Sequence, residues 1–132
     1  APVPVGPALP TDVHAAVQQL TAEDSWDPKA LHAEVTSGRR DELWSPAAET
    51  ELSALYRRVH GLDTSAISVR CAESLCEVAA ATPPGLSKDA GFDIIHRTSL
   101  VTSAEGLDQI GYSLGGAPDH VFVYLGYWRR KD

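Results

Sequence analysis

Residues 67–80 read Ile-Ser-Val-Arg-Cys-Ala-Glu-Ser-Leu-Cys-Glu-Val-Ala-Ala and contain both cysteines of the 132-residue chain. Ile67, Val69 and Cys71 alternate with polar residues, as on a strand that buries one face, and the alternation resumes at Cys76. With four residues between them, the two cysteines would face each other across an antiparallel hairpin, at a separation that a disulfide spans. The stretch therefore predicts a β-hairpin closed by a Cys71–Cys76 disulfide.

The same cysteines bear on redox and metal chemistry. A redox-active pair is usually spaced Cys-x-x-Cys at a helix start, and a zinc site needs further thiolates or a matched pair of histidines. Neither context surrounds Cys71 and Cys76. We expect a structural disulfide, with zinc binding or redox switching as the alternatives. A disulfide favours an oxidising compartment.

Composition excludes several classes of protein. The chain has 18 acidic and 11 basic residues, and its net charge of −7 repels nucleic-acid phosphates and anionic lipid surfaces. Its longest apolar runs, such as residues 121–125, are far short of the roughly 20 that cross a bilayer. With a hydrophobic content of 43%, the chain is expected to bury one core.

The first ten residues differ in composition from the rest. They read Ala-Pro-Val-Pro-Val-Gly-Pro-Ala-Leu-Pro, which predicts a semi-rigid extended spacer at 1–10 before a single domain at 11–132. The chain contains no methionine, even at position 1, and such spacers often follow a signal peptide or a lipid-anchor site. We therefore expect a periplasmic or secreted protein, with a lipid anchor upstream as a further hypothesis.

Three helices are predicted before the hairpin. The first follows an N-cap at Thr11 or Asp12, and the second follows an N-cap at Asp27 with proline at the first helical position. The third has Ser45 as its cap and is stopped by Gly61. Its buried face has the helical spacing of Leu52, Leu55, Tyr56 and Val59.

The second half predicts one more helix and a second hairpin. Ser87 caps a helix that runs towards Arg97. The β-branched and aromatic residues at 112–114 and 120–128 predict strands joined through a glycine-rich turn at 115–119.

The predicted fold is α+β: an antiparallel sheet of about four strands, in two hairpins, with the N-terminal helices and the inter-hairpin helix packed on one face. The core face would carry Val69, Val78, Val121, Val123 and Leu125, with Phe122, Tyr124 and Trp128 on the opposite face.

One string has the form of a catalytic motif. Residues 111–116, Gly-Tyr-Ser-Leu-Gly-Gly, resemble the nucleophile elbow of α/β-hydrolase lipases and esterases. In that motif a strand delivers the serine to a turn and a helix follows at once, whereas Gly-Gly-Ala-Pro follows here. Asp119 and His120 are adjacent, so their side chains would point in different directions on an extended chain. We expect a glycine-rich hairpin, and a small esterase that uses Ser113 is the alternative.

The histidines are scattered along the chain. They are His14, His32, His60, His96 and His120. None of them pairs at the spacing of a zinc protease, and only Asp93 and His96 would share a helix face as the start of a metal site. We therefore expect no metal site and no cofactor.

The carboxyl-terminal strand is rich in the residue types that dominate binding hot spots. These are Tyr124, Tyr127, Trp128, Arg129 and Arg130. On an edge strand they would receive a partner by strand addition or by side-chain docking. The alternative is a core-packed strand followed by a solvated basic tail.

The segment 44–78 joins a capped helix to Val-x-Cys-x4-Cys-x-Val. It resembles a pattern in uncharacterised small exported proteins and lipoproteins of bacteria. That resemblance implies an exported α+β domain and brings no catalytic residues with it.

These observations predict a non-enzymatic binding or accessory domain of the inhibitor or immunity type. Its expected partner is another protein of the cell envelope or exterior, and nucleic acid is not expected. Two alternatives remain open: the esterase that uses Ser113, and a small-ligand carrier with a pocket lined by Trp26, Trp44 or Trp128.

Overall fold

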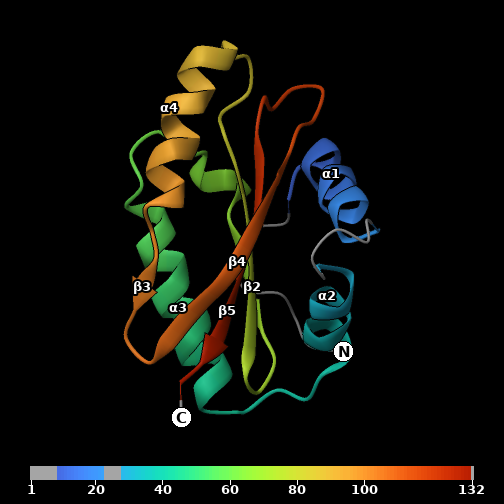
Figure 1. Cartoon of the computed structure of the whole chain (residues 1–132), viewed down its shortest axis with the longest axis vertical. Coiled ribbons are helices and arrows are strands. Elements are labelled where there is room, and N and C mark those ends of the chain that lie inside the picture. The colour runs from blue at the N-terminus through green and yellow to red at the C-terminus, as the bar shows by residue number, and fades with distance from the viewer. Residues whose placement is uncertain (1–8, 23–27, 132) are drawn as a thin grey trace.

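The computed structural model describes residues 9–22 and 28–131, which form four α-helices and five strands (Figure 1). The helices are α1 (Thr11–Ala22), α2 (Pro28–Ser37), α3 (Trp44–Arg57) and α4 (Lys88–Ser99), and a 3-10 helix, η1, spans Thr64–Ala66. The strands are β1 (Ser68–Cys71), β2 (Leu75–Ala81), β3 (Ser103–Ala104), β4 (Leu107–Gly115) and β5 (Val123–Arg130). Most of the predicted spacer, Trp26 and the predicted N-cap at Asp27 lie outside the described residues.

The strands form an antiparallel sheet in the order β1-β2-β5-β4-β3. β1 and β2 are the predicted first hairpin, with Cys71 opposite Cys76. β4 and β5 form the second, with Leu114 opposite Tyr124. The α+β class and both hairpins are thus confirmed, and the short β3 makes five strands in the described chain instead of about four.

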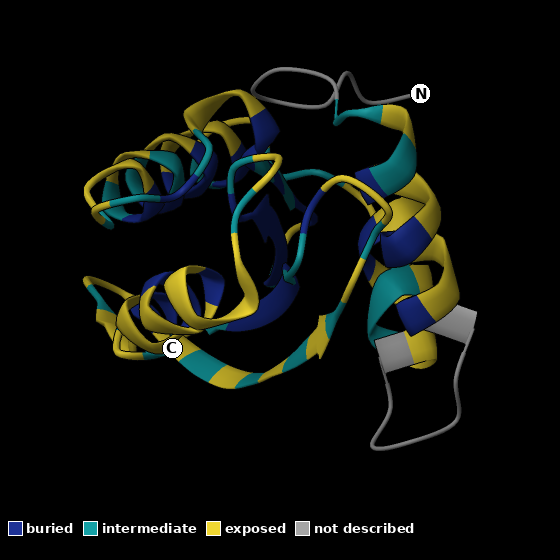
Figure 2. Cartoon of the chain, turned by 90° about the horizontal axis from the view of Figure 1, so that it is seen from above, coloured by how far each residue is buried: buried dark blue, intermediate teal, exposed yellow. Residues whose placement is uncertain are grey.

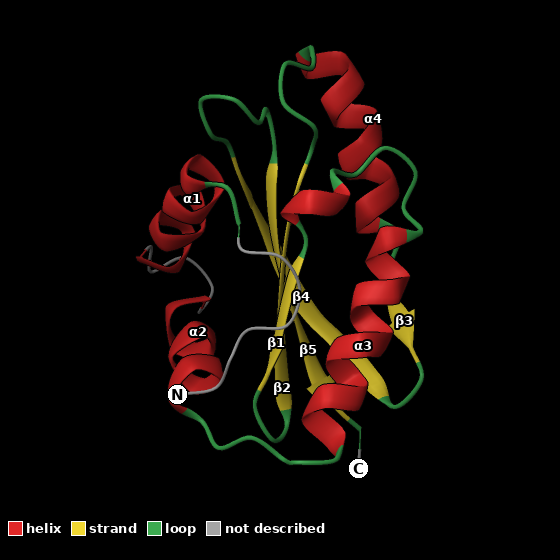
Figure 3. Cartoon of the chain, turned by 180° about the vertical axis from the view of Figure 1, so that it is seen from behind, coloured by secondary structure: helices red, strands yellow, loops and turns green. Residues whose placement is uncertain are grey.

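Helices cover both faces of this sheet, so the prediction that they share one face is wrong. α1 and α2 pack on one face, here called the α1 face, and α3 and α4 pack on the other, the α3 face (Figure 3). β2 is buried at every position, and β5 is buried from residue 123 to residue 128. Strands that are buried on both sides require cover on both sides.

The side chains of β5 alternate between the two cores. Seen from above, the buried central strands lie between the helices of the two faces (Figure 2). Tyr124 and Trp128 pack with Val78 on the α3 face, whereas Val123 and Leu125 pack on the α1 face. The predicted grouping of Val123 and Leu125 with Val78 is therefore wrong. The prediction assumed that one side of the sheet faces solvent. In the structure, one set of alternate side chains packs against α3 and α4, and the other set packs against α1 and α2.

Polar atoms of aromatic side chains hydrogen-bond to one another in the α3-face core. The Trp128 Nε1 donates to the Tyr56 hydroxyl at 3.1 Å, and that hydroxyl lies 2.7 Å from the Tyr124 hydroxyl. Gln109 Nε2 donates to the Tyr124 hydroxyl at 2.9 Å. Burial raises the pKa of both tyrosines, so this core network is uncharged.

The helix starts test two predicted N-caps. Ser87 accepts a hydrogen bond from the Ala90 N–H at 3.2 Å, which confirms it as the cap of α4. At α3, the N–H groups of residues 43 and 44 donate to Asp41 Oδ1 at 3.0 and 2.8 Å. These bonds lower the pKa of Asp41. The prediction of Ser45 as this cap is therefore wrong, because Asp41 satisfies the first N–H groups.

Candidate functional site

The disulfide predicted at the mouth of the first hairpin is formed between Cys71 and Cys76. It joins β1 to β2 in the register that the sequence predicts. Beside it, the Ser45 hydroxyl donates to the Ala72 carbonyl at 2.9 Å, which ties the start of α3 to the hairpin. The bond takes up both cysteines of the chain, so neither is left as a free thiol.

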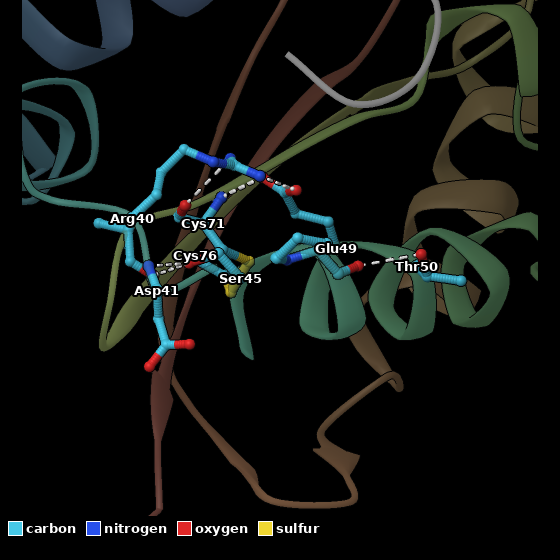
Figure 4. A network of polar contacts seen from close by, with 9 residues as sticks. Arg40, Asp41, Ser45, Glu49, Thr50, Cys71 and Cys76 are labelled. Carbon is cyan, nitrogen blue, oxygen red and sulfur yellow. Dashed lines mark hydrogen bonds and ion pairs between the residues drawn. A yellow bond between two sulfur atoms is a disulfide. The ribbon is translucent and has the colours of Figure 1, made fainter. Parts of the chain in front are cut away.

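A buried carboxylate lies next to this disulfide (Figure 4). Arg40 donates to Glu49 through both terminal nitrogens, at 2.6 and 2.9 Å, and this pairing raises the pKa of Arg40. The Cys71 N–H donates to the same carboxylate at 2.8 Å. Glu49 thereby occupies a backbone donor of the edge strand β1, and its own charge is balanced by Arg40.

The aromatic residues of the predicted partner-binding set do not lie on an edge strand. β5 lies between β2 and β4, and Tyr124, Tyr127 and Trp128 are fully buried. The prediction of β5 as an edge is wrong, because it pairs with β2 from residue 123 to residue 129 as well as with β4. These rings therefore hold the two cores together and offer no surface to a partner.

The arginines of that set reach the surface. Arg129 lies 3.3 Å from a Glu34 carboxylate oxygen, and Arg130 lies 3.4 Å from one of Asp41. The Arg130 guanidinium also lies 4.8 Å from the centre of the Trp44 ring. Both arginines pair with residues of the α2 and α3 region, so they fasten the carboxyl end of β5.

Ser113 does not have the setting of a nucleophile elbow. It lies within β4 opposite Leu125, and the strand continues to Gly115. The next element is the strand β5 and not a helix. A helix behind the serine supplies an oxyanion donor in that motif, and this arrangement lacks it.

His120, which follows the serine motif in the sequence, is buried and lies within hydrogen-bond distance of α1. Its Nδ1 lies 2.8 Å from Asp12 Oδ2, and its Nε2 lies 3.8 Å from Asp63 Oδ2. The Asp119 N–H donates to the same Asp12 oxygen at 3.2 Å, and the contact with His120 lowers the pKa of Asp12. These contacts fasten the β4–β5 loop to the start of α1.

The residues considered for a metal site and for a small-ligand pocket lie in separate parts of the structure. Among the described residues, no group of three histidine, cysteine or carboxylate side chains is placed to hold a metal ion. Asp93 and His96 are exposed on α4. Trp128 is fully buried, whereas Trp44 is half-buried under Arg130 and lines a pocket of about 300 Å³ together with Glu51 and Leu107.

The open edge of the sheet is on β4. In the part of the chain that the structure describes, β3 pairs with β4 only at Leu107 and Asp108. Beyond that point Ile110, Tyr112 and Leu114 are 40%, 39% and 42% exposed. The sequence reading missed this edge because it began the strand at residue 112 and placed the edge on the following strand.

A titratable cluster lies on the α1 face. His32 Nδ1 lies 2.6 Å from Glu77 Oε2, and the Tyr127 hydroxyl donates to the same oxygen at 2.7 Å. The hydrogen bond to Glu77 raises the pKa of His32, and burial together with the Glu77 charge raises that of Tyr127. The sequence held one signal for this cluster: Glu77 is a charge within an otherwise apolar strand, and such a charge needs partners.

Models of known protein families, curated proteins and solved structures contain no match to this chain. No helix in the described ranges is long and apolar enough to cross a membrane. The function of the chain is therefore inferred from its own geometry.

Proposed function

We propose that this chain is a non-enzymatic binding domain that adds an extended segment of another protein to the open edge of β4. The observation that carries the proposal is the row of exposed apolar side chains at Ile110, Tyr112 and Leu114, on a strand that β3 covers only at its start. In strand addition, main-chain hydrogen bonds supply affinity and alternate side chains supply specificity.

The two edges of the sheet support this choice. At the end of β1, the Glu49 carboxylate accepts the Cys71 N–H and pairs with Arg40, so charged side chains cover that part of the edge. Exposed edges in natural proteins are usually blocked by charges or by such cover. Residues 109–115 contain no charged side chain, although the whole chain carries a net charge of −7. An unblocked apolar edge is suited to a partner.

The partner that fits is an extended segment with apolar side chains at alternate positions, because these would meet Ile110, Tyr112 and Leu114. We place the protein in the bacterial periplasm or outside the cell, as an accessory, inhibitor or immunity-type domain. The Cys71–Cys76 disulfide supports this placement, since disulfides persist in oxidising compartments.

The test is selection of extended peptides from a display library on the wild-type chain, followed by affinity measurement. Tyr112→Lys and Leu114→Lys should each weaken the selected peptides about tenfold or more, because a charge replaces an apolar contact. Leu43→Lys is the matched control, since Leu43 is 86% exposed but lies on the loop before α3.

Hydrogen exchange separates strand addition from side-chain docking. Peptide binding should slow exchange of amides within 109–115, because new main-chain hydrogen bonds protect them. Peptides that bind the Tyr112→Lys chain as tightly as the wild type would count against the proposal. A concentration-dependent dimer that this variant abolishes would instead assign the edge to a second copy of the chain.

A further inference from the structure

A pocket of about 350 Å³ lies on the α1 face, on the opposite side of the sheet from α3. Its walls come from α1, α2, β1 and β2, and we call it the α1–β1 pocket. The residues used below are His14 and Val17 of α1, His32 of α2, Arg70 of β1, and Glu77 and Ala79 of β2. The volume is at the small end of the range for ligand pockets, about 300–1,000 Å³.

The carboxylate of Glu77, the acidic group of this pocket, already has two hydrogen-bond partners within the protein. One oxygen of Glu77 lies 2.6 Å from His32 Nδ1 and accepts a hydrogen bond from Tyr127 at 2.7 Å. Protonated His32 therefore balances the charge of Glu77. While His32 is protonated, the pair adds no net charge to the pocket.

Arg70 supplies a positive charge that this pair does not balance. It lies opposite Glu77 in the β1–β2 register and is half-buried, but its guanidinium forms no hydrogen bond or ion pair with another described residue. Its guanidinium carries five N–H donors in a planar fork. Burying part of a cation costs free energy unless an anion or hydrogen-bond acceptors compensate it.

We propose that the α1–β1 pocket binds a small organic carboxylate, with the carboxylate group on Arg70 and His32 and the apolar body against Val17 and Ala79. The guanidinium fork matches the two oxygens of a carboxylate. One unbalanced positive charge fits a monoanion better than the dianion of a phosphate, and the apolar walls fit an organic body. This site is separate from the β4 edge, so it does not depend on the partner proposed there.

The affinity depends on pH through His32. The hydrogen bond to Glu77 raises its pKa, whereas burial and the charge of Arg70 lower it. The ionisable groups around the ring are His14 from α1, Arg70 from β1, Glu77 from β2 and Tyr127 from β5. Carboxylate binding weakens as pH rises through the pKa of His32, because the ring loses its positive charge.

The test is a titration of the ¹⁵N-labelled full chain, followed by amide chemical shifts. The probes are hexanoate and benzoate, with hexanamide as the uncharged match and inorganic phosphate as the other anion, each to about 10 mM, where millimolar affinities are visible. The carboxylates should shift amides of the pocket walls, while hexanamide and phosphate should not.

Arg70→Gln should weaken hexanoate binding about tenfold or more, and His32→Gln should remove its pH dependence. Arg129→Gln, which changes a surface arginine at the end of β5, is the matched control and should leave the affinity unchanged. Arg70→Lys serves if the glutamine variant does not fold, since it keeps the charge but loses the fork.

Three results would overturn the assignment: pocket amides that neither carboxylate shifts, hexanamide that binds as tightly as hexanoate, or phosphate that binds in preference to both carboxylates. All three results come from the wild-type chain, so they decide the proposal whether or not the variants fold. Since the probes contain no peptide, their failure would leave the β4-edge proposal standing.

Discussion

The two faces of the sheet share β2 and β5, but different kinds of side chain pack on them. On the α3 face, Tyr56, Tyr124 and Trp128 form an uncharged hydrogen-bonded core. On the α1 face, a carboxylate and an imidazole lie beside a pocket, with His32 about a third exposed. The titratable groups of the α1 face lie next to a pocket, whereas the aromatic core of the α3 face is uncharged and the Arg40–Glu49 ion pair lies at the edge of that face.

The largest expected effect on the free energy of unfolding comes from the aromatic core of the α3 face. Trp128→Ala should lower the free energy of unfolding by about 4 kcal/mol, because it leaves a cavity among fully buried rings. Tyr127→Phe, one position away on the α1 face, should cost only about 1 kcal/mol for the lost hydrogen bond. Urea denaturation of both variants measures the two losses of free energy of unfolding. Equal losses would contradict the expected difference between the two faces.

The next largest effect concerns the Arg40–Glu49 ion pair at the edge of the α3 face, here called the charged corner. Glu49→Gln should lower the free energy of unfolding by about 3 kcal/mol, because Arg40 loses the charge that balances it. Glu42→Gln, an exposed substitution in the preceding loop, should stay within about 0.5 kcal/mol of wild type in the same denaturation experiment. A Glu49→Gln chain as stable as this control would show that the corner does not stabilise the fold.

The smallest effect is the pH response of the α1 face. Because the folded pKa of His32 lies above its unfolded value, its stabilising contribution is complete below about pH 6.5 and is lost as pH rises through the folded pKa. The contribution should be below about 1 kcal/mol, since solvent reaches the ring.

Denaturation midpoints across this range in wild type and His32→Gln measure that contribution. The variant should lose the part of the slope that belongs to His32. His60→Gln should keep it, because this change leaves the His32–Glu77 pair in place. A wild-type slope that survives in His32→Gln would assign the pH response to another group.

Local sequence patterns predicted local structure well. The alternation around Cys71 and Cys76 predicted the hairpin, its register and its disulfide, because strand periodicity and loop length act within a few residues. The Ser87 cap was predicted for the same reason. The Ser45 cap was not, because the helix begins one residue earlier, at Trp44, and the Asp41 carboxylate accepts the N–H groups of residues 43 and 44.

The sites were predicted less well, because they join distant residues. Tyr124, Tyr127 and Trp128 have the composition of a binding strand, but pairing with β2 places them inside the sheet. His32 and Glu77 are 45 residues apart, and no local pattern links them. Only the presence of Glu77 in an apolar strand indicated that a partner was needed.

The α+β class, the two hairpins and the disulfide could be predicted from the amino-acid sequence, since they follow from periodicity and short-range geometry. The strand order, the cover on both faces, the open edge at β4 and the pocket at Arg70 depend on how the elements assemble. Local patterns do not contain this information, because burial is a property of the assembled layers. A strand rich in aromatic residues has the same sequence pattern at the edge of a sheet as at its centre. Only the strands that pair with it decide which of the two positions it occupies.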